Sequence, residues 1–133
     1  MDAVVLDAQP LVAYLLDEPL ADAVDARLRA AQRAGRCLVG TVNWCEVLYI
    51  VRRTRGPRAA ARAGKLLEAA SITLVDADAE LATFAAEIKS RYGLALGDSF
   101  AAALAIATGS PLMTADTDFL PLAEHGLKLD WLG

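Results

Sequence analysis

The chain is poor in the residues that bind zinc or form disulfides. Its 133 residues include one histidine and two cysteines, Cys37 and Cys45, and there is no CxxC pair. Zinc sites are built mainly from these two residue types, so a zinc site is poorly supported. Both cysteines lie in apolar stretches, and we expect them to pack in the core of a protein from a reducing compartment.

The chain also lacks an apolar run long enough to span a membrane, although 56% of its residues are hydrophobic. A membrane helix needs about 20 consecutive apolar residues. The first residues, Met1 to Val4, have no positive charge of the kind that begins a signal peptide, so we expect a cytoplasmic protein with no membrane contact. The formal net charge of −4 argues against a surface that coats nucleic acid generally.

Apolar segments of strand length alternate with helical segments along the chain. This pattern predicts an α/β fold in one domain, residues 1–133, with a central, mostly parallel sheet of four to five strands flanked by helices. The expected strands cover residues 3–6, 36–40, 71–75, 111–114 and 127–131. The expected helices cover residues 11–16, 19–34, 42–53, 57–70, 97–108 and a segment that follows a cap at Asp76 or Asp78 and ends near 92.

Four carboxylates lie in or beside apolar segments. Asp7 and Asp116 each follow a predicted strand, Glu46 lies inside an apolar helix, and Asp98 opens an alanine-rich helix. A carboxylate removed from water is unstable unless it meets a cation or several donors, and no nearby Lys or Arg is an obvious partner. The carboxyl ends of parallel strands form a ligand-binding edge. If the fold gathers these side chains there, a divalent metal with oxygen ligands is the natural compensating charge.

Each carboxylate also has a purely structural interpretation. Asp98, in a first helical turn, would be stabilised by the helix dipole and could be a cap. Asp116 suits an Asx-turn, and Asp7 suits the amides of the loop after its strand. Glu46 is the hardest to explain structurally, because Asn43 is its one polar neighbour on its own helix. The set of four is therefore more informative than any member.

A basic stretch with no acidic residue separates Glu46 from Glu68. Its cations are Arg52, Arg53, Arg55, Arg58, Arg62 and Lys65. The last three fall at i, i+4 and i+7, on one face of a helix. This face is either simply solvated or it attracts phosphates beside the acidic residues.

Four segments resemble the ordered motifs of a known family. They are Val4-Val5-Leu6-Asp7-Ala8, Thr41-Val42-Asn43-Trp44-Cys45-Glu46-Val47, Leu96-Gly97-Asp98-Ser99-Phe100 and Pro111-Leu112-Met113-Thr114-Ala115-Asp116-Thr117-Asp118. In this order and spacing, over essentially the whole chain, they are similar to the PIN-domain ribonucleases. The closest resemblance is to the VapC-type toxins of bacterial toxin–antitoxin pairs.

The resemblance implies a metal-dependent endoribonuclease whose products carry 5′-phosphate and 3′-hydroxyl ends. The implied catalytic and metal-binding residues are Asp7, Glu46, Asp98 and Asp116. The candidates for supporting roles are Asp118, Thr114 and Asn43, although Asp118 is first interpreted as a cap. The resemblance also implies Mg²⁺ or Mn²⁺, an RNA substrate contacted by the six basic residues, a homodimer, and inhibition by a small antitoxin protein.

One residue departs from the family pattern, and two other classes of protein stay open. Gln9 occupies a position where many relatives carry a small hydroxyl residue, which affects hydrogen bonding near Asp7. A catalytically silent PIN-like module would bind RNA or a partner without cutting. A phosphoacceptor receiver domain also has acids at strand ends, but it needs a paired acidic motif after the first strand and a lysine near the last strand's end, and neither is evident here.

Overall fold

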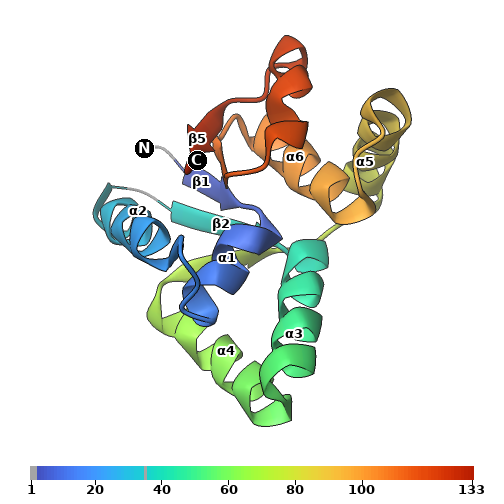
Figure 1. Ribbon diagram of the computed structural model, residues 1–133. Helices are drawn as coiled ribbons and strands as arrows, with labels where there is room; N and C mark the ends of the chain where they lie inside the picture. Colours follow the sequence, from blue (N-terminus) through green and yellow to red (C-terminus); the bar gives the residue numbers. More distant parts are fainter. Residues whose placement is uncertain (1–2, 35) are drawn as a thin grey trace.

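All five strands of the central sheet run parallel (Figure 1). The computed structural model describes residues 3–34 and 36–133. Its strands are β1 (Ala3–Leu6), β2 (Arg36–Gly40), β3 (Ile72–Val75), β4 (Leu112–Thr114) and β5 (Leu129–Trp131), in the order β3-β2-β1-β4-β5 across the sheet. Each connection contains helical segments, as parallel strands require. The predicted α/β fold with a parallel central sheet is confirmed.

Helices cover both faces of this sheet. They are α1 (Ala8–Leu15), α2 (Ala21–Ala34), α3 (Thr41–Arg55), α4 (Pro57–Ala69), α5 (Ala79–Tyr92), α6 (Leu96–Thr108) and a 3-10 helix, η1 (Thr117–His125). Helices α1 to α4 pack on one face, and α5, α6 and η1 pack on the other (Figure 1). No helix in the described part of the chain combines the length and the apolar character needed to cross a membrane.

Successive residues of the central strand enter two separate cores. Val4 and Leu6 of β1 pack with α1 to α4, whereas Val5 between them packs with α5 and α6. Side chains along a strand alternate between the two faces of the sheet. Because both faces are covered, β1 reads as a continuous apolar run with no polar alternation.

Small side chains allow α6 to lie close to the sheet and to α5. Ala101, Ala102, Ala103 and Ala105 are all fully buried. Alanine favours the helical conformation and occupies little space between packed elements. The first turn of α6, which contains Asp98, is therefore carried toward the carboxyl edge of the sheet.

Several helix starts differ from those expected by one to three residues, and hydrogen bonds at α1 and α3 show how two of these helices begin. α1 begins at Ala8, because the side chain of Asp7 accepts a hydrogen bond from the backbone N–H of Ala8 and caps the helix. The N-cap of α3 is Gly40 and has no side-chain hydrogen bond. The hydroxyl of Thr41 instead accepts a hydrogen bond from the N–H of Ala77, at 3.1 Å, in the loop after β3.

The two cysteines lie in different environments. Cys37 is buried in β2, as expected, and burial raises the pKa of its thiol to about 11. Cys45 is exposed on α3, so the expectation that both pack in the core is wrong for this residue. Its apolar sequence neighbours lie on other sides of the same helix, which short-range sequence context does not reveal.

Candidate active site

The order of the strands changes direction between β1 and β4. From β1 the chain adds β2 and then β3 on one side, and it returns to place β4 on the other side of β1. In open α/β sheets, ligands bind beyond the carboxyl ends of the strands at such a switch point. Asp7 directly follows β1, and Asp116 lies just beyond β4.

Thr114, the last residue of β4, connects these two aspartates. Its Oγ1 donates a hydrogen bond to Asp7 Oδ2 at 3.2 Å and accepts one from the N–H of Asp116 at 3.1 Å. Asp7 Oδ1 accepts a hydrogen bond from the N–H of Ala8 at 2.9 Å. Thr114 is fully buried and Asp7 is 3% exposed. Asp7 is therefore held to α1 and to β4 at the same time.

Asn43 connects Glu46 with the start of α6. Its Nδ2 donates to Glu46 Oε1 at 3.2 Å and to the backbone oxygen of Gly97 at 3.0 Å. Asn43 is fully buried, and its Oδ1 has no hydrogen-bond partner within the described residues. A Cβ on Gly97 would collide with the carboxylate of Glu46. Since Gly97 directly precedes Asp98, these contacts bring the second and third predicted carboxylates together.

One cavity of about 400 Å³ gathers all four predicted carboxylates. Its lining includes Asp7, Glu46, Asp98 and Asp116, together with Gln9, Glu18, Ile50 and Ala95. No group of three or more acidic, histidine or cysteine side chains in residues 3–34 and 36–133 is arranged so that it could hold a metal ion as it stands. The carboxylates thus share a cavity without forming a closed cage.

Burial raises the pKa of three of these groups, and repulsion from neighbouring carboxylates raises the pKa further in two of them, Asp7 and Asp98. Burial, and then the charge of Asp98, raises the pKa of Asp7 from 3.8 to about 7. Burial, and then the charges of Asp116 and Glu46, raises the pKa of Asp98 from 3.8 to about 6. Burial also raises the pKa of Glu46, opposed by the hydrogen bond from Asn43. A cluster of this kind holds its negative charge only at a cost in free energy.

Within residues 3–34 and 36–133, no cation forms an ion pair with any of the four carboxylates. The ion pairs between described residues all lie elsewhere, and they join Arg27 to Asp130, Arg29 to Asp25, and Arg91 to Glu124. Carboxylate oxygens are the ligands that Mg²⁺ and Mn²⁺ prefer, and three of the four side chains, Glu46, Asp98 and Asp116, are only half-buried, so an ion can reach them from solvent. The residues present therefore fit a divalent ion with oxygen ligands.

Asp118 does not line the cavity. Its side chain is exposed, and its N–H donates to Asp116 Oδ1 at 2.9 Å, the Asx-turn expected for Asp116. Its charge still contributes to the raised pKa of Asp98. Glu18, which the sequence did not single out, also lines the cavity. The available signal was a pair of acids, Asp17 and Glu18, shortly after the first helix, and that is too common to indicate a site.

The six basic residues surround the corner between α3 and α4 and are all exposed. Arg52, Arg53 and Arg55 lie in the last turns of α3, and Arg58, Arg62 and Lys65 lie on α4. None of them lines the acidic cavity. Arg55 and Arg62 instead line a groove of about 210 Å³ where α3 and α4 meet the end of α1. The basic residues thus lie toward the C-terminal end of α3, whereas Glu46 lies nearer the start of this helix.

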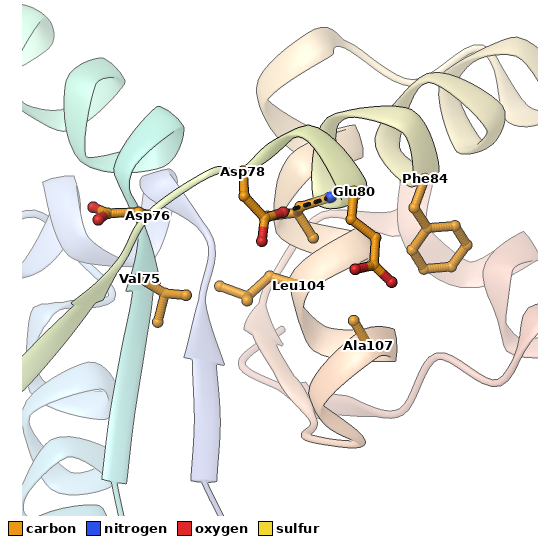
Figure 2. A pocket seen from close by; sticks show the side chains of 8 residues that line it. Val75, Asp76, Asp78, Glu80, Phe84, Leu104 and Ala107 are labelled. Carbon is orange, nitrogen blue, oxygen red and sulfur yellow. Dashed lines mark hydrogen bonds between the residues drawn. The ribbon is translucent and has the colours of Figure 1, made fainter.

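A separate cavity of about 340 Å³ lies beyond the end of β3, between α5 and α6 (Figure 2). Its acidic members are Asp76, Asp78 and Glu80, and its apolar members include Phe84 and Leu104. The carboxylate of Asp78 is already used as the N-cap of α5, since it accepts a hydrogen bond from the N–H of Leu81 at 2.8 Å. This cavity contains none of the four predicted carboxylates.

The fold and the cavity together define an α/β domain with an acidic ligand site at the carboxyl edge of its parallel sheet. The profile of the PIN domain family matches residues 4–124. Over 122 residues the chain is 31% identical to the VapC ribonuclease Mb0640 of Mycobacterium bovis. The aligned region covers 86% of this chain and 91% of that relative. The chain belongs to the PIN domain family.

Solved structures share the fold at lower sequence identity. The DNA-bound VapBC of Salmonella typhimurium has a TM-score of 0.81 and 14% identity, with 100% of both chains covered. VapBC-5 of Mycobacterium tuberculosis, a member of the VapBC family of toxin–antitoxin systems, has a TM-score of 0.63 and 20% identity. That match covers 98% of this chain and 99% of the other.

Proposed function

We propose that this protein is a metal-dependent endoribonuclease and the toxin of a toxin–antitoxin pair. The observation that carries the proposal is the cavity at the switch point, where four carboxylates from four parts of the chain meet and none forms an ion pair with a cation of the described residues. Membership of the PIN domain family and the likeness to a VapC ribonuclease support the choice of RNA as substrate.

Each carboxylate has a role that follows from how it is held. Asp7, Glu46 and Asp98 would hold a Mg²⁺ or Mn²⁺ ion, directly or through water. Asp7 is fixed by Thr114 and Ala8, so it is the rigid member of the set. Asp116, bound to the same threonine through its N–H, completes the set or orients the attacking water.

The reaction is hydrolysis of a phosphodiester bond. A divalent ion lowers the pKa of water and offsets negative charge on the phosphoryl oxygens. The carboxylates orient the water for in-line attack on phosphorus. The water oxygen forms a new bond to phosphorus and loses a proton, the bond to the 3′ oxygen breaks, and the 3′ oxygen takes up a proton from water, so the products carry a 5′-phosphate and a 3′-hydroxyl. Neither histidine nor lysine lines this cavity, so no alternative general base is placed there.

The surroundings of the site suit a polyanion. An acidic cavity repels RNA unless its charge is offset. The exposed cations from Arg52 to Lys65 attract the phosphates of RNA to the surface of this protein. The proposed domain occupies residues 1–133, acts in the cytoplasm, forms a homodimer and binds a small antitoxin. An antitoxin arginine that enters the cavity would pair with its carboxylates and inhibit the enzyme.

The test is cleavage of total cellular RNA by antitoxin-free protein in Mg²⁺ or Mn²⁺ and in EDTA. Asp98→Asn is the inactive control, and Asp76→Asn, in the separate cavity of Figure 2, is the matched control for loss of one carboxylate. We expect metal-dependent cutting that Asp98→Asn abolishes and Asp76→Asn retains. Mapping the fragment ends then identifies the target and the end chemistry.

Two results would contradict the proposal. Cutting that persists in EDTA, or that survives in Asp98→Asn, removes the assigned role of the carboxylates. Divalent-ion binding without cleavage of any cellular RNA would identify a catalytically silent PIN-like module.

A further inference from the structure

The surface of α3 beside Glu46 carries an exposed aromatic ring with an arginine stacked over it. Tyr49 is 51% exposed, and the guanidinium carbon of Arg53 lies 5.0 Å from the centre of its ring. A guanidinium over a ring face is attracted by the electrons of the ring. The two side chains therefore form one exposed surface that combines an aromatic ring with a positive charge.

This surface begins where the acidic cavity ends. Tyr49 follows Glu46 by three residues, so their Cβ atoms are neighbours about 5–6 Å apart on the helix. Arg53 follows Glu46 by seven residues, or about 10.5 Å along the helix axis. Ile50, next to Tyr49, lines the acidic cavity itself. A single-stranded nucleic acid that extends from the cavity along α3 would therefore reach Tyr49 first and Arg53 next.

Tyr49 also borders a second depression, on the other side of α3. This cavity of about 570 Å³ lies between α3 and α4, and its lining includes Trp44, Leu48, Tyr49 and Arg52. Most of its exposed surface is apolar. Tyr49 thus lies on α3 between the acidic cavity, which its neighbour Ile50 lines, and the apolar cavity, which Tyr49 and Arg52 line.

The charge of this region suits phosphates. Arg52 and Arg53 are exposed, and neither forms an ion pair with a carboxylate among the described residues. An arginine guanidinium can donate two parallel hydrogen bonds to a phosphate. Unstacked bases bind to exposed aromatic rings and to guanidinium planes, which is the usual way in which proteins hold single-stranded RNA.

We propose that Tyr49 and Arg53 form a nucleotide-binding subsite for the single-stranded RNA next to the scissile phosphodiester. The base stacks on the Tyr49–Arg53 surface, and the arginine also contacts a backbone phosphate. This inference rests on the proposed ribonuclease function, since it assigns the position of the substrate. The subsite contributes to substrate affinity and to the choice of cleavage site.

The first experiment measures binding of a short fluorescent single-stranded RNA of mixed sequence to Asp98→Asn protein in Mg²⁺. In this background, Tyr49→Ala lowers affinity about tenfold, the usual loss for one stacked base. Tyr49→Phe retains most of the affinity, because the ring is preserved. Lys128→Ala, an exposed cation at the opposite edge of the sheet, is the control and leaves affinity unchanged.

Salt dependence separates the two parts of the subsite. Loss of one phosphate contact lowers the slope of log K against log salt concentration by about 0.7 for single strands. Arg53→Met therefore lowers the slope. Tyr49→Ala instead lowers RNA affinity at every salt concentration and leaves the slope unchanged. In active protein, Tyr49→Ala raises KM more than it lowers kcat and changes the distribution of cleavage sites on cellular RNA.

The subsite and the nuclease activity can fail separately. Wild-type cleavage with unchanged affinity and cleavage sites in Tyr49→Ala overturns the subsite alone. Loss of a dimer in Tyr49→Ala, with RNA affinity unchanged, also overturns it and assigns this face to contact between copies of the chain. RNA binding that depends on Tyr49 and Arg53, with no cleavage by wild-type protein, supports the subsite and overturns the nuclease function. Absence of RNA binding by every variant overturns the subsite.

Discussion

The carboxylate of Glu46 occupies the space in which a side chain at Gly97 would begin. A Cβ built on Gly97 collides with the carboxylate, and Asn43 donates hydrogen bonds to both residues. Glycine at this position is therefore required by a close approach between α3 and α6. The approach sets the separation between Glu46 and Asp98, the residue after Gly97.

Gly97→Ala tests this relationship. The added methyl group has to displace Glu46 or the first turn of α6, and we expect loss of about 1–3 kcal/mol of stability from overpacking. Displacement of a catalytic carboxylate by about an ångström should lower cleavage about a hundredfold. Urea denaturation and initial cleavage rates measure the two effects.

The matched control is Gly64→Ala. Gly64 lies inside α4, and a Cβ there meets nothing within 4 Å. Alanine should stabilise this helix by about 0.5–1 kcal/mol and leave cleavage unchanged. Wild-type stability and activity in Gly97→Ala would show that the close contact has no functional consequence.

Asn43 offers a second test of the same region. Asn43→Ala leaves the oxygens of Gly97 and Glu46 without their donor, which costs about 1–3 kcal/mol of stability. It should also weaken binding of Mn²⁺, measured by electron paramagnetic resonance, because Glu46 is no longer held. Asn43→Asp should be less stable still at neutral pH, because a carboxylate then faces these two oxygens.

Ser99→Ala is the control that separates a loss of stability from a loss of Mn²⁺ binding. The hydroxyl of buried Ser99 donates to the backbone oxygen of Ala95 at 2.9 Å, and no hydrogen bond between described residues joins it to any of the four carboxylates. Its removal should lower stability but leave Mn²⁺ affinity unchanged. If Asn43→Ala behaves in the same way, Asn43 stabilises the fold and does not position Glu46.

The sequence predicts the sheet and two of the four carboxylate positions for clear physical reasons. Strands buried on both faces appear as short apolar runs, so their ends locate Asp7 and Asp116 at one edge. Glu46 is conspicuous because a lone charge in an apolar helix needs a partner. These inferences depend only on local composition and on the geometry of parallel sheets.

Contacts between distant segments are not visible in the same way. Asn43 and Gly97 meet across the interface between two helices, and neither residue type indicates this locally. The double role of Asp7, as a cap of α1 and as the partner of Thr114, moves the start of α1 to Ala8. The exposure of Cys45 depends on the rotation of α3 about its axis, which amphipathic periodicity defines poorly in a helix packed on several sides.

The stability of the metal-free protein should fall as pH rises. The folded-state pKa of Asp7 is raised from 3.8 to about 7, so between these values the folded protein retains a proton that the unfolded chain has lost. The folded state then binds more protons than the unfolded state, and its stability falls by up to roughly 1.4 kcal/mol per pH unit for each retained proton. Asp98 contributes in the same direction from 3.8 to about 6.

Urea denaturation in EDTA across this pH range measures the effect, and Asp7→Asn should reduce it. The asparagine can donate a hydrogen bond to the Thr114 hydroxyl, which has a free lone pair, so the fold should be retained. A metal-free wild-type protein whose stability rises from pH 3.8 to about 7 would contradict the repulsive character of the cavity.

Thr114 is predicted to act through its hydroxyl. Thr114→Val keeps the shape of the side chain but removes the donor to Asp7 and the acceptor for the N–H of Asp116. We expect a loss of about 1–3 kcal/mol from the unpaired buried groups and a clear loss of cleavage. Thr114→Ser restores the hydroxyl and should recover most of the activity. Equal activity in the valine and serine variants would exclude a positioning role.

Divalent ions should stabilise the folded protein, and this effect should itself depend on pH. An ion that binds only the folded state at about 100 times its Kd adds roughly 2.7 kcal/mol. Protons compete for the same oxygens, because the pKa of Asp7 is about 7 and that of Asp98 about 6, so Mn²⁺ should raise the Tm more at about pH 8 than at about pH 5. Asp98→Asn should remove the rise in Tm, and Asp76→Asn should keep it. If Asp98→Asn keeps the rise in Tm and Asp76→Asn loses it, the ion binds away from the switch point, and the four carboxylates do not form the metal site.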